Sequence, residues 1–459
     1  MRAFLLHDLM THAGTEAGLM FVGADSTAVF GLYKDVFEEG IAEGVNNSNP
    51  LGDIFKPIKV DFKGGKGHTF EAHVGRNPSP MFVAEDGAFA GAGAQRHING
   101  TVHVRKMMAR LRLTQEAMDD SVSSEASWKS AKKDEMTRII DDIAKREEFA
   151  LSTDGKGVFC LLAGDPGTTS TTVEVDSPGN IAGTSFGNRF LQKGMFLAAI
   201  NPTSGAIRAG ISKVVDVNED GSDYTAAAVT DTDWGDNDYL VQAANSSVTD
   251  VLDTAYNKAY RGLPALIDDG TNLANYFEIQ RSLAPSYKSY VVSSAGALAT
   301  DAMQRTADVL YQKLGGEVTR LLMHPSVRRE FLKLTEADRR YGPASSDKKQ
   351  SDPGTVAFKK PGGDVSMGEV PVTPIRTLGL DQVYFLDENR MSAKQYVAEP
   401  GRFVDEDGSI LVRDGVGDSA RHAFEAWWFA RKENFIGNPA VCARWDGVTG
   451  QTLVVVPEL

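Results

Sequence analysis

The sequence has few features of a secreted protein, a membrane protein or a protein that reads nucleic-acid sequence. Only two of its 459 residues are cysteines, Cys160 and Cys442, so a disulfide framework is excluded. The apolar run near the start ends at Leu6, which is too short for a signal-peptide core. No stretch approaches the roughly 18 apolar residues of a membrane span. Positive charge is also in deficit, because 48 Lys and Arg face 62 Asp and Glu, a net charge of −14.

The composition is that of a folded chain rich in turns. Hydrophobic residues make up 42% and charged residues 24%, which is ordinary for globular proteins and enough for a sizeable core. Glycine accounts for 45 residues, above the usual level of about 7%. We therefore expect many turns and much β structure, in about three modules of roughly 150 residues.

The first part of the chain reads as an arm followed by a ribbon. Residues 26–45 have the apolar spacing of a helix. Residues 59–113 contain Asn99-Gly100 between apolar residues, a signal for a hairpin turn. This stretch has nine Lys or Arg and four Asp or Glu, a net charge of +5, so the rest of the chain has −19. A two-stranded ribbon is marginal alone in water, and the electrostatic partner for a basic one is another copy of this acidic chain.

One long helix and then β structure are predicted after the ribbon. From 114 to 151, apolar residues such as Ile139 and Ile143 recur at helical spacing, and about 30 helical residues would span roughly 45 Å. Residues 155–250 hold short β segments between Pro and Gly turns, which predicts a small barrel or sandwich. From 213 to 253 the chain contains ten Asp or Glu and one Lys.

The C-terminal part predicts a mixture of helices and strands. Helical spacing covers 295–314, where Gly315-Gly316 is expected to cap the helix, and 326–335. The polar segment 341–363 is expected to be a mobile loop. Trp427 and Trp428 alternate faces of a strand, so at most one of them belongs to a core. The predicted strands are 319–323, 370–375, 382–386, 393–397, 423–431 and 441–445.

One segment matches a catalytic pattern. Residues 183–187 read GTSFG, like the nucleophile elbow of hydrolases, in which a serine such as Ser185 sits on a turn between a strand and a helix. A Ser-Pro-Gly turn precedes the segment and a β-like run, 190–200, follows it. An ordinary turn is therefore the favoured interpretation.

We expect no catalytic residue, no cofactor and no metal. Residues 216–221 match half of an EF-hand loop, but Ala227 stands where its bidentate Glu should be. Gly91-Ala92-Gly93 lacks the third glycine of a dinucleotide fingerprint. A solvated acidic loop is favoured over a cation site for Asp231, Asp233, Asp236 and Asp238. Zinc spacing is absent among His68, His73, His97 and His103.

Several segments stand in an order that resembles a known family. They are Val60-Asp61-Phe62, Thr101–Leu113, Glu125–Leu151, Thr153–Gly157, Phe190–Met195, Leu321–Ser326, Gly368–Val372, Val383–Asp387 and Trp427–Trp445. Over essentially the whole chain this order is similar to that of the major capsid protein of tailed bacteriophages, which has the Hong Kong 97-like fold.

The resemblance implies an α+β fold made of six segments. They are an N-terminal arm at 1–58, an extended loop hairpin at 59–113, the long spine helix of a peripheral domain at 114–154, an inserted small β-barrel at 155–250, an axial domain at 251–400 and strands returning to the peripheral domain at 401–459. The extended loop would reach over a neighbouring subunit. We expect its contacts at Lys59, Lys63, Lys66, Arg76, Arg96, Arg105 and Lys106.

The function implied by the resemblance is self-assembly. Hexamers and pentamers of the chain would form an icosahedral shell around double-stranded DNA, without sequence-specific DNA binding and without a membrane. The partners would be other copies, a portal protein and a scaffolding protein, with a decoration protein left open. Assembly would take place in the host cytoplasm, and the product would be the virion capsid. We expect no cleavage of an N-terminal segment, and a covalent cross-link through Lys63 or Lys66 stays open.

Two other classes of function remain. One is a serine hydrolase that uses Ser185 and needs His and Asp partners in space. The other is a carbohydrate-binding virion protein built on the β-rich module and the tryptophans. The order of ribbon and long helix favours a shell protein that is not an enzyme.

Overall fold

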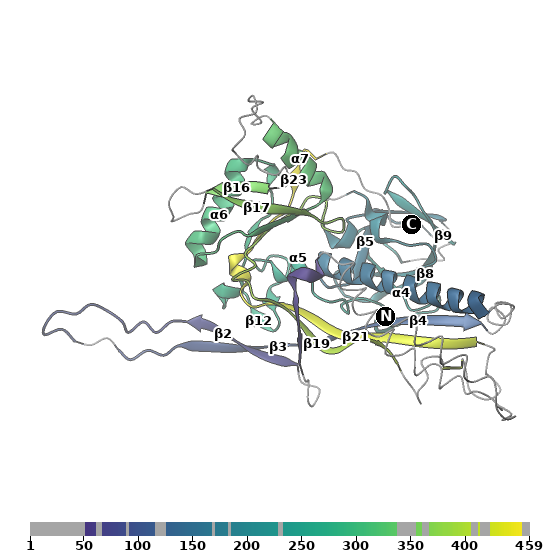
Figure 1. The fold of residues 1–459 in the computed structure, drawn as a ribbon, viewed down its shortest axis with the longest axis horizontal. Coiled ribbons are helices and arrows are strands. Elements are labelled where there is room, and N and C mark those ends of the chain that lie inside the picture. The colour runs from purple at the N-terminus through teal and green to yellow at the C-terminus, as the bar shows by residue number, and fades with distance from the viewer. Residues whose placement is uncertain are drawn as a thin grey trace, which may run out of the picture.

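The computed structural model has an α+β architecture with a projecting hairpin (Figure 1). A sheet crossed by a long helix and a six-stranded sheet with two helices meet around a shared core. A closed barrel has a core of its own, which Phe149 of the long helix joins. The mixed class and the small closed barrel are as predicted. The structure describes residues 51–60, 67–88, 91–114, 125–167, 170–181, 185–227, 233–336, 355–359, 367–404, 412–413 and 423–451.

The long helix lies across a five-stranded sheet. The helix is α4 (Glu125–Ser152), and its Ile143 and Ala144 pack against Ala426 and Trp428 of the sheet. Trp428 is 1% exposed whereas Trp427 is half-buried on the opposite face, as the alternation predicts. The strands are β1 (Lys56–Lys59), β19 (Ala393–Phe403), β21 (Ala423–Ile436) and β20 (Val412–Arg413) in that order, with β4 (Arg105–Thr114) also paired to β21.

The barrel follows α4 in the chain and is filled with apolar side chains. Its strands are β5 (Val158–Leu162), β6 (Thr172–Asp176), β7 (Phe196–Ile200), β8 (Ile207–Val217), β9 (Asp223–Ala227) and β10 (Tyr239–Gln242). The order β10-β5-β6-β9-β8-β7 closes through a pairing of β7 with β10. Leu197, Tyr224 and Leu240 lie in its core with no exposed surface.

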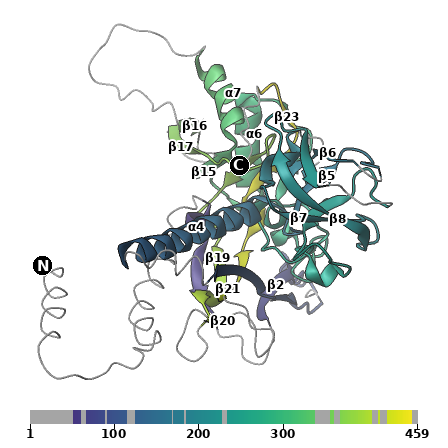
Figure 2. The same ribbon diagram turned by 90° about the vertical axis from the view of Figure 1, so that its right-hand side faces the viewer.

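The third part is a mixed sheet covered by two amphipathic helices, which lie above the sheet that α4 crosses, while the barrel lies to one side (Figure 2). α6 (Thr300–Leu314) ends at Gly315, whose φ of 69° is left-handed, as the Gly-Gly cap predicts. α7 (Pro325–Glu336) follows the strand β15. In sheet order the strands are β13 (Tyr290–Val292), β22 (Ala443–Trp445), β18 (Val383–Leu386), β15 (Arg320–Met323), β17 (Met367–Pro374) and β16 (Thr355–Lys359).

The short elements complete the fold. They are β2 (His68–Gly75), β3 (Arg96–Val102), α5 (Leu263–Leu266), β11 (Asn275–Tyr276), β12 (Ile279–Gln280), β14 (Gly296–Ala297) and β23 (Val448–Thr449), with 3-10 turns at Gly52–Ile54, Pro178–Asn180, Gly187–Phe190, Val251–Asp253, Pro285–Tyr287 and Pro439–Val441. Among the described residues, no helix is long and apolar enough to cross a membrane.

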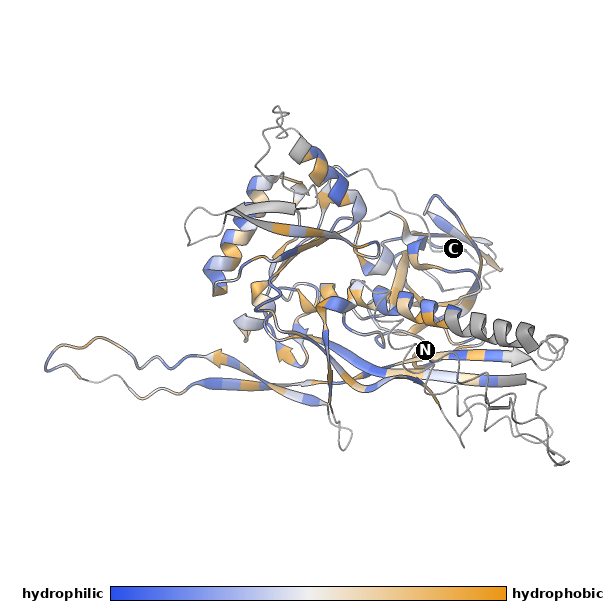
Figure 3. Ribbon diagram, viewed as in Figure 1, coloured by the Kyte–Doolittle hydropathy of each residue, from blue (hydrophilic) through white to orange (hydrophobic). Residues whose placement is uncertain are grey.

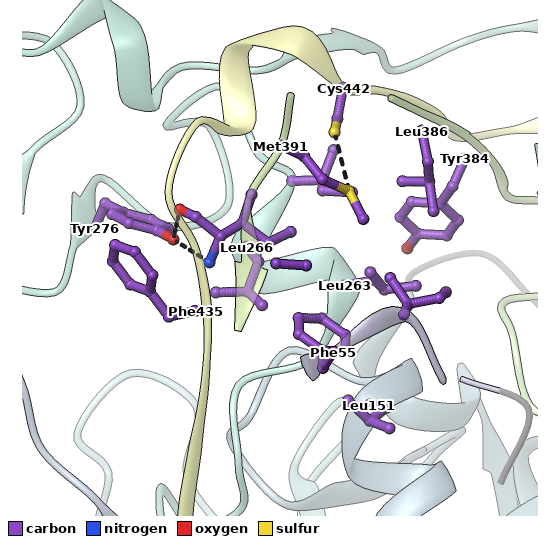
Figure 4. Packing of buried hydrophobic residues seen from close by; sticks show 14 of the residues in the cluster. Phe55, Leu151, Leu263, Leu266, Tyr276, Tyr384, Leu386, Met391, Phe435 and Cys442 are labelled. Atoms are coloured by element: carbon purple, nitrogen blue, oxygen red, sulfur yellow. Dashed lines mark hydrogen bonds between the residues drawn. The ribbon is translucent and has the colours of Figure 1, made fainter. Parts of the chain in front are cut away.

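The shared core joins segments that are far apart in the sequence (Figure 4). Phe55, Leu151 and Leu263 meet there, although they precede β1, end α4 and begin α5. The Tyr276 hydroxyl donates to the Ile436 carbonyl at 2.6 Å, which satisfies a phenol that has 1% exposure. The two sheets and the end of α4 therefore share one apolar cluster, whereas the barrel has its own core.

Three local predictions were wrong. Asn99-Gly100 is no hairpin turn, because both residues lie inside β3 opposite Glu71 and Phe70. Part of the expected loop at 341–363 is the strand β16. The expected β run at 190–200 begins as a 3-10 turn and becomes the strand β7 only at Phe196. The helix predicted at 26–45 lies outside the described residues.

Candidate functional site

The hairpin formed by β2 and β3 is fixed to the body at one end. Its Phe70 ring lies 4.9 Å from the Phe435 ring and 5.6 Å from the Tyr287 ring. Opposite Phe70 stands Gly100, where a Cβ would lie 2.7 Å from the Phe70 ring and 2.8 Å from the Ile279 side chain. The glycine is needed for close packing within a strand rather than for a turn. The hairpin root is therefore part of the shared core.

Beyond the root, the hairpin leaves the body (Figure 1). Its distal segment is exposed and contains the large apolar residues Met81, Phe82 and Val83, which are 57%, 105% and 46% exposed. Glu85 and Asp86 follow them and are also exposed. Hydrophilic and hydrophobic residues both run along this projection (Figure 3). A fully exposed Phe at the end of a projecting arm is typical of a surface that meets a partner.

The +5 net charge of residues 59–113 lies outside residues 67–102, because β4 contributes +4 and residues 59–66 contribute +2, which differs from the expected basic ribbon. The projecting part, residues 67–102, has two arginines, Arg76 and Arg96, against three carboxylates, a net charge of −1. Four cations and no carboxylate fall in β4, which belongs to the body. The sequence window mixed these two elements because they are consecutive in the chain.

Three of the seven predicted contact residues, Lys59, Arg105 and Lys106, lie on the body and not on the projection. Lys59 ends β1, beside β19. The guanidinium of Arg105 donates to the carbonyls of Gly155 at 2.9 Å and Ala259 at 2.5 Å. Its Nε also lies 3.2 Å from the Glu433 carboxylate. Lys106 is on the body, and Lys63 and Lys66 lie outside the described residues.

The outer face of the sheet, opposite α4, combines cations with apolar side chains. On β4, Lys106 and Met108 are exposed, Met108 by 65%. They stand beside Arg431 and Phe429 of β21, and Arg402 of β19 is paired with Phe429. We call these five residues the basic face. Sequence reasoning missed it because its members come from three strands that are far apart in the chain.

Cations border an aromatic ring on the basic face. The Lys106 ammonium lies 5.2 Å and the Arg402 guanidinium 5.7 Å from the centre of the Phe429 ring. Such cation–π contacts hold the charges beside the ring at little cost in hydration. The Glu399 carboxylate lies 3.6 Å from Arg431. Because three cations face this one carboxylate, the net charge of the basic face remains positive.

Arg110 and Arg112 continue the row of cations along β4. Both lie near the buried carboxylate of Glu425 on β21, which is 3% exposed. The Nε of Arg110 donates to this carboxylate at 3.0 Å, and Arg112 lies 3.9 Å from it. This carboxylate is therefore held by the arginines of its own sheet.

The histidines of the hairpin do not form a metal centre. His73 and His97 are cross-strand neighbours with ring centres 5.1 Å apart, and His97 lies 3.0 Å from Glu71. His73 is hydrogen-bonded to Gln95 at 2.6 Å. Within the part of the chain that the structure describes, no three His, Cys, Asp or Glu residues are grouped so that they could hold a metal ion.

Ser185 lacks the surroundings of a nucleophile elbow. It is exposed and lies between two 3-10 turns, not between a strand and a helix. Gly187 has a packing reason, because a Cβ there would lie 2.4 Å from the backbone of Asp176. Phe186 has a left-handed φ of 64° and covers Gly221. Residues 185–187 pack on the barrel and lead into a 3-10 turn, which agrees with the interpretation favoured from the sequence.

Two acidic residues of the barrel loops are held by contacts within the chain. Asp238, 1% exposed, forms a two-point ion pair with Arg208 at 2.9 and 3.2 Å. Asp220, in the segment that resembles half an EF-hand loop, accepts the backbone and hydroxyl hydrogens of Ser222. These bonds lower the pKa of Asp220. Asp231 lies outside the described residues.

Buried polar groups elsewhere serve the fold. Arg444, 1% exposed, donates to the carbonyls of Pro264 and Ile267 and pairs with Asp268 at 3.2 Å, which ties α5 to β22. Both cysteines are buried, and burial raises the pKa of Cys442 to about 12, so its thiol stays protonated. Neither feature indicates a reaction.

The sequence matches no protein-family model and no curated protein. Similar solved structures include the Cyanophage A-1(L) capsid asymmetric unit, with 11% identity, a TM-score of 0.45 and coverage of 96% of this chain and 98% of that one. The capsid of the native GTA particle has 11% identity, a TM-score of 0.42 and 95% coverage of both chains. Mycobacterium phage Adephagia has 13% identity, a TM-score of 0.38 and 90% coverage of both. At these identities the likeness concerns the fold alone.

Proposed function

We propose that this chain is the shell subunit of a tailed-phage capsid. The observation that carries the proposal is the hairpin of β2 and β3, which is anchored at Phe70 but exposes Phe82 completely. A projecting pair of strands gains little from its own chain, so its stability and its purpose depend on a partner. A second copy is always available to a protein that assembles with itself.

The finer parts of the proposal follow the resemblance. Copies would join head to tail into hexamers and pentamers, because a heterologous contact closes into a ring when its rotation permits. The six-segment division, with α4 as the spine of a peripheral domain and the barrel as an insertion, belongs to the same proposal. The shell would be assembled in the host cytoplasm with a portal and a scaffolding protein, and would enclose double-stranded DNA without reading its sequence.

Neither alternative gains a specific observation. A hydrolase would need Ser185 on a strand-to-helix turn, and it lies between 3-10 turns. A carbohydrate site would need exposed tryptophans. Three of them, Trp234, Trp428 and Trp445, are at most 3% exposed.

The test is the size of the assembled protein. The full chain is expressed with and without its candidate scaffolding protein, then measured by light scattering and imaged in negative stain. Rings of five and six copies, or closed shells of tens of nanometres, are expected. A monomer or dimer under every condition would overturn the proposal.

A further inference from the structure

One turn on the barrel exposes a leucine between two carboxylates. Leu252 lies in the 3-10 turn Val251–Asp253 and is 75% exposed. Among the large apolar residues that the structure describes, only Phe82 is more exposed. Asp250 and Asp253 are exposed on either side of Leu252. We call residues 250–253 the acidic turn, and a partner surface for it needs an apolar centre and a positive border.

The acidic turn is held in place by its own chain. The Asp250 carboxylate accepts the Leu252 amide at 2.9 Å. The Lys258 ammonium donates to the carbonyl of Thr254 at 2.8 Å, and a β-bridge between Thr254 and Ala243 fixes the turn to the barrel beyond β10. Because the turn is already ordered, burying Leu252 against a partner costs little conformational entropy. A rigid, exposed leucine is therefore suited to a specific contact.

The C-terminal end of α6 has the two properties that such a partner needs. Leu314, the last residue of the helix, is 44% exposed. The Lys313 ammonium beside it donates to the Lys288 carbonyl at 2.7 Å, and Arg390 donates to the Gly315 carbonyl. The three cationic residues are all exposed. We call Lys288, Lys313, Leu314 and Arg390 the helix-end patch.

The charges of the helix-end patch are incompletely balanced within the chain. Partial burial and the positive charge of Lys288 lower the pKa of Lys313, and the negative charge of Asp269 offsets only part of this effect. A carboxylate brought in from outside would therefore be attracted to these cations. The acidic turn supplies two carboxylates, in a stretch, 213–253, that contains ten Asp or Glu and one Lys.

The barrel and α6 lie on different sides of the body (Figure 1). α6 is on the side from which the hairpin projects, and β5, β8 and β9 are on the other. The Phe149 ring of α4 lies 4.9 Å from the rings of Phe159 and Phe190, which fixes the barrel to α4. Leu310 of α6 has no exposed surface. The acidic turn and the helix-end patch can therefore meet only between copies, in a heterologous contact.

We propose that the acidic turn on the barrel of one copy docks on the helix-end patch of the next copy. Leu252 packs against Leu314, and the carboxylates of Asp250 and Asp253 pair with the cations around it. The inference rests on the proposed function, and the hairpin takes no part in this contact. It gives the inserted barrel a role in joining neighbouring subunits. The opposite charges set the register of the contact, and the two leucines supply its apolar centre.

The first experiment is a disulfide between copies of the full-length chain. Leu252→Cys and Leu314→Cys are made separately and together, and both native cysteines are buried, so they do not compete. After mild oxidation of the assembled protein, the double variant is expected to give covalent oligomers of up to five and six copies on a denaturing gel. Each copy then supplies one cysteine to each neighbour. Each single variant is expected to stay monomeric on that gel.

The second experiment is a charge reversal with its rescue. Asp253→Lys and Lys288→Glu are each expected to raise the concentration needed for assembly by at least about threefold. The chain that carries both changes is expected to return to within about twofold of the unmodified protein, because opposite charges face each other again. The control is Glu219→Lys, which changes an exposed carboxylate of the barrel outside the acidic turn.

The apolar part is tested separately. Leu252→Ser is expected to raise the concentration needed for assembly by at least about tenfold. Its control is Leu334→Ser on α7, since Leu334 is 38% exposed and lies outside both surfaces. Thermal unfolding of each variant shows whether it is folded before its assembly is measured.

The outcomes separate this inference from the proposed function. If the unmodified protein forms no rings or shells, the proposed function fails. If it assembles but the double cysteine variant stays monomeric on the gel, or the charge reversals give no rescue, the docking contact is wrong. Covalent dimers from one single variant would indicate a symmetric contact and overturn the inference. So would a Leu252→Ser chain that assembles normally but no longer binds another virion protein, because the acidic turn would then serve that partner.

Discussion

His324 is a buried residue whose titration is coupled to folding. It precedes α7, its Nδ1 accepts the Ser326 amide at 3.2 Å, and it is 4% exposed. Burial, assisted by the positive charge of Arg189, lowers its pKa from 6.5 to about 3. The native state therefore binds fewer protons than the unfolded state, so the stability contributed by the neutral ring is complete above about pH 6.5 and is lost as pH falls towards 3.

We predict that His324→Asn reduces the loss of stability in acid. Asparagine can still accept the Ser326 amide as an N-cap but does not titrate. Between pH 7 and pH 4 the unmodified protein should lose on the order of a few kcal/mol more unfolding free energy than the variant. Urea unfolding at several pH values measures this difference. Parallel pH profiles would contradict the assignment to His324.

Gly100 and Gly91 provide a matched pair on one hairpin. A Cβ at Gly100 would lie 2.7 Å from the Phe70 ring, whereas nothing lies within 4 Å of a Cβ at Gly91. Gly100→Ala should therefore destabilise the protein by about 1–3 kcal/mol, and Gly91→Ala should leave stability unchanged within about 0.5 kcal/mol. Thermal unfolding compares the two. Equal effects would mean that Gly100 is not needed for packing at the hairpin root.

At the scale of elements, α4 is held on its sheet by a buried ion pair. The Lys432 ammonium of β21 donates to the Glu147 carboxylate of α4 at 2.8 Å, and the two side chains are 9% and 7% exposed. Lys432→Met should cost about 3 kcal/mol, because it leaves a buried carboxylate without its cation. Adding Glu147→Leu should recover most of that loss. If the double variant is as unstable as Lys432→Met alone, apolar residues cannot replace the ion pair, and the prediction is wrong.

Sequence patterns predicted an element well where residues of that element alone determine its conformation. The apolar stripe around Ile143 located the helix that ends at Ser152, and the Gly-Gly cap located the end of α6. Prediction failed where contacts with a segment distant in the sequence determine the conformation. Asn99-Gly100 is a turn signal by itself, but the Phe70 ring, the Ile279 side chain and the Phe277 carbonyl leave room only for a glycine inside the strand. A rule that considers only neighbouring residues cannot predict such a contact.

At the scale of the whole molecule, the charge pattern could not be read from the chain. A window over 59–113 gave +5, yet the projecting residues 67–102 carry −1 and β4 carries the cations. The basic face also needs Phe429 and Arg431 from β21, which the sequence separates from Lys106 by more than three hundred positions. The order of elements was predictable, whereas the candidate contact surface depends on strand pairing across the fold.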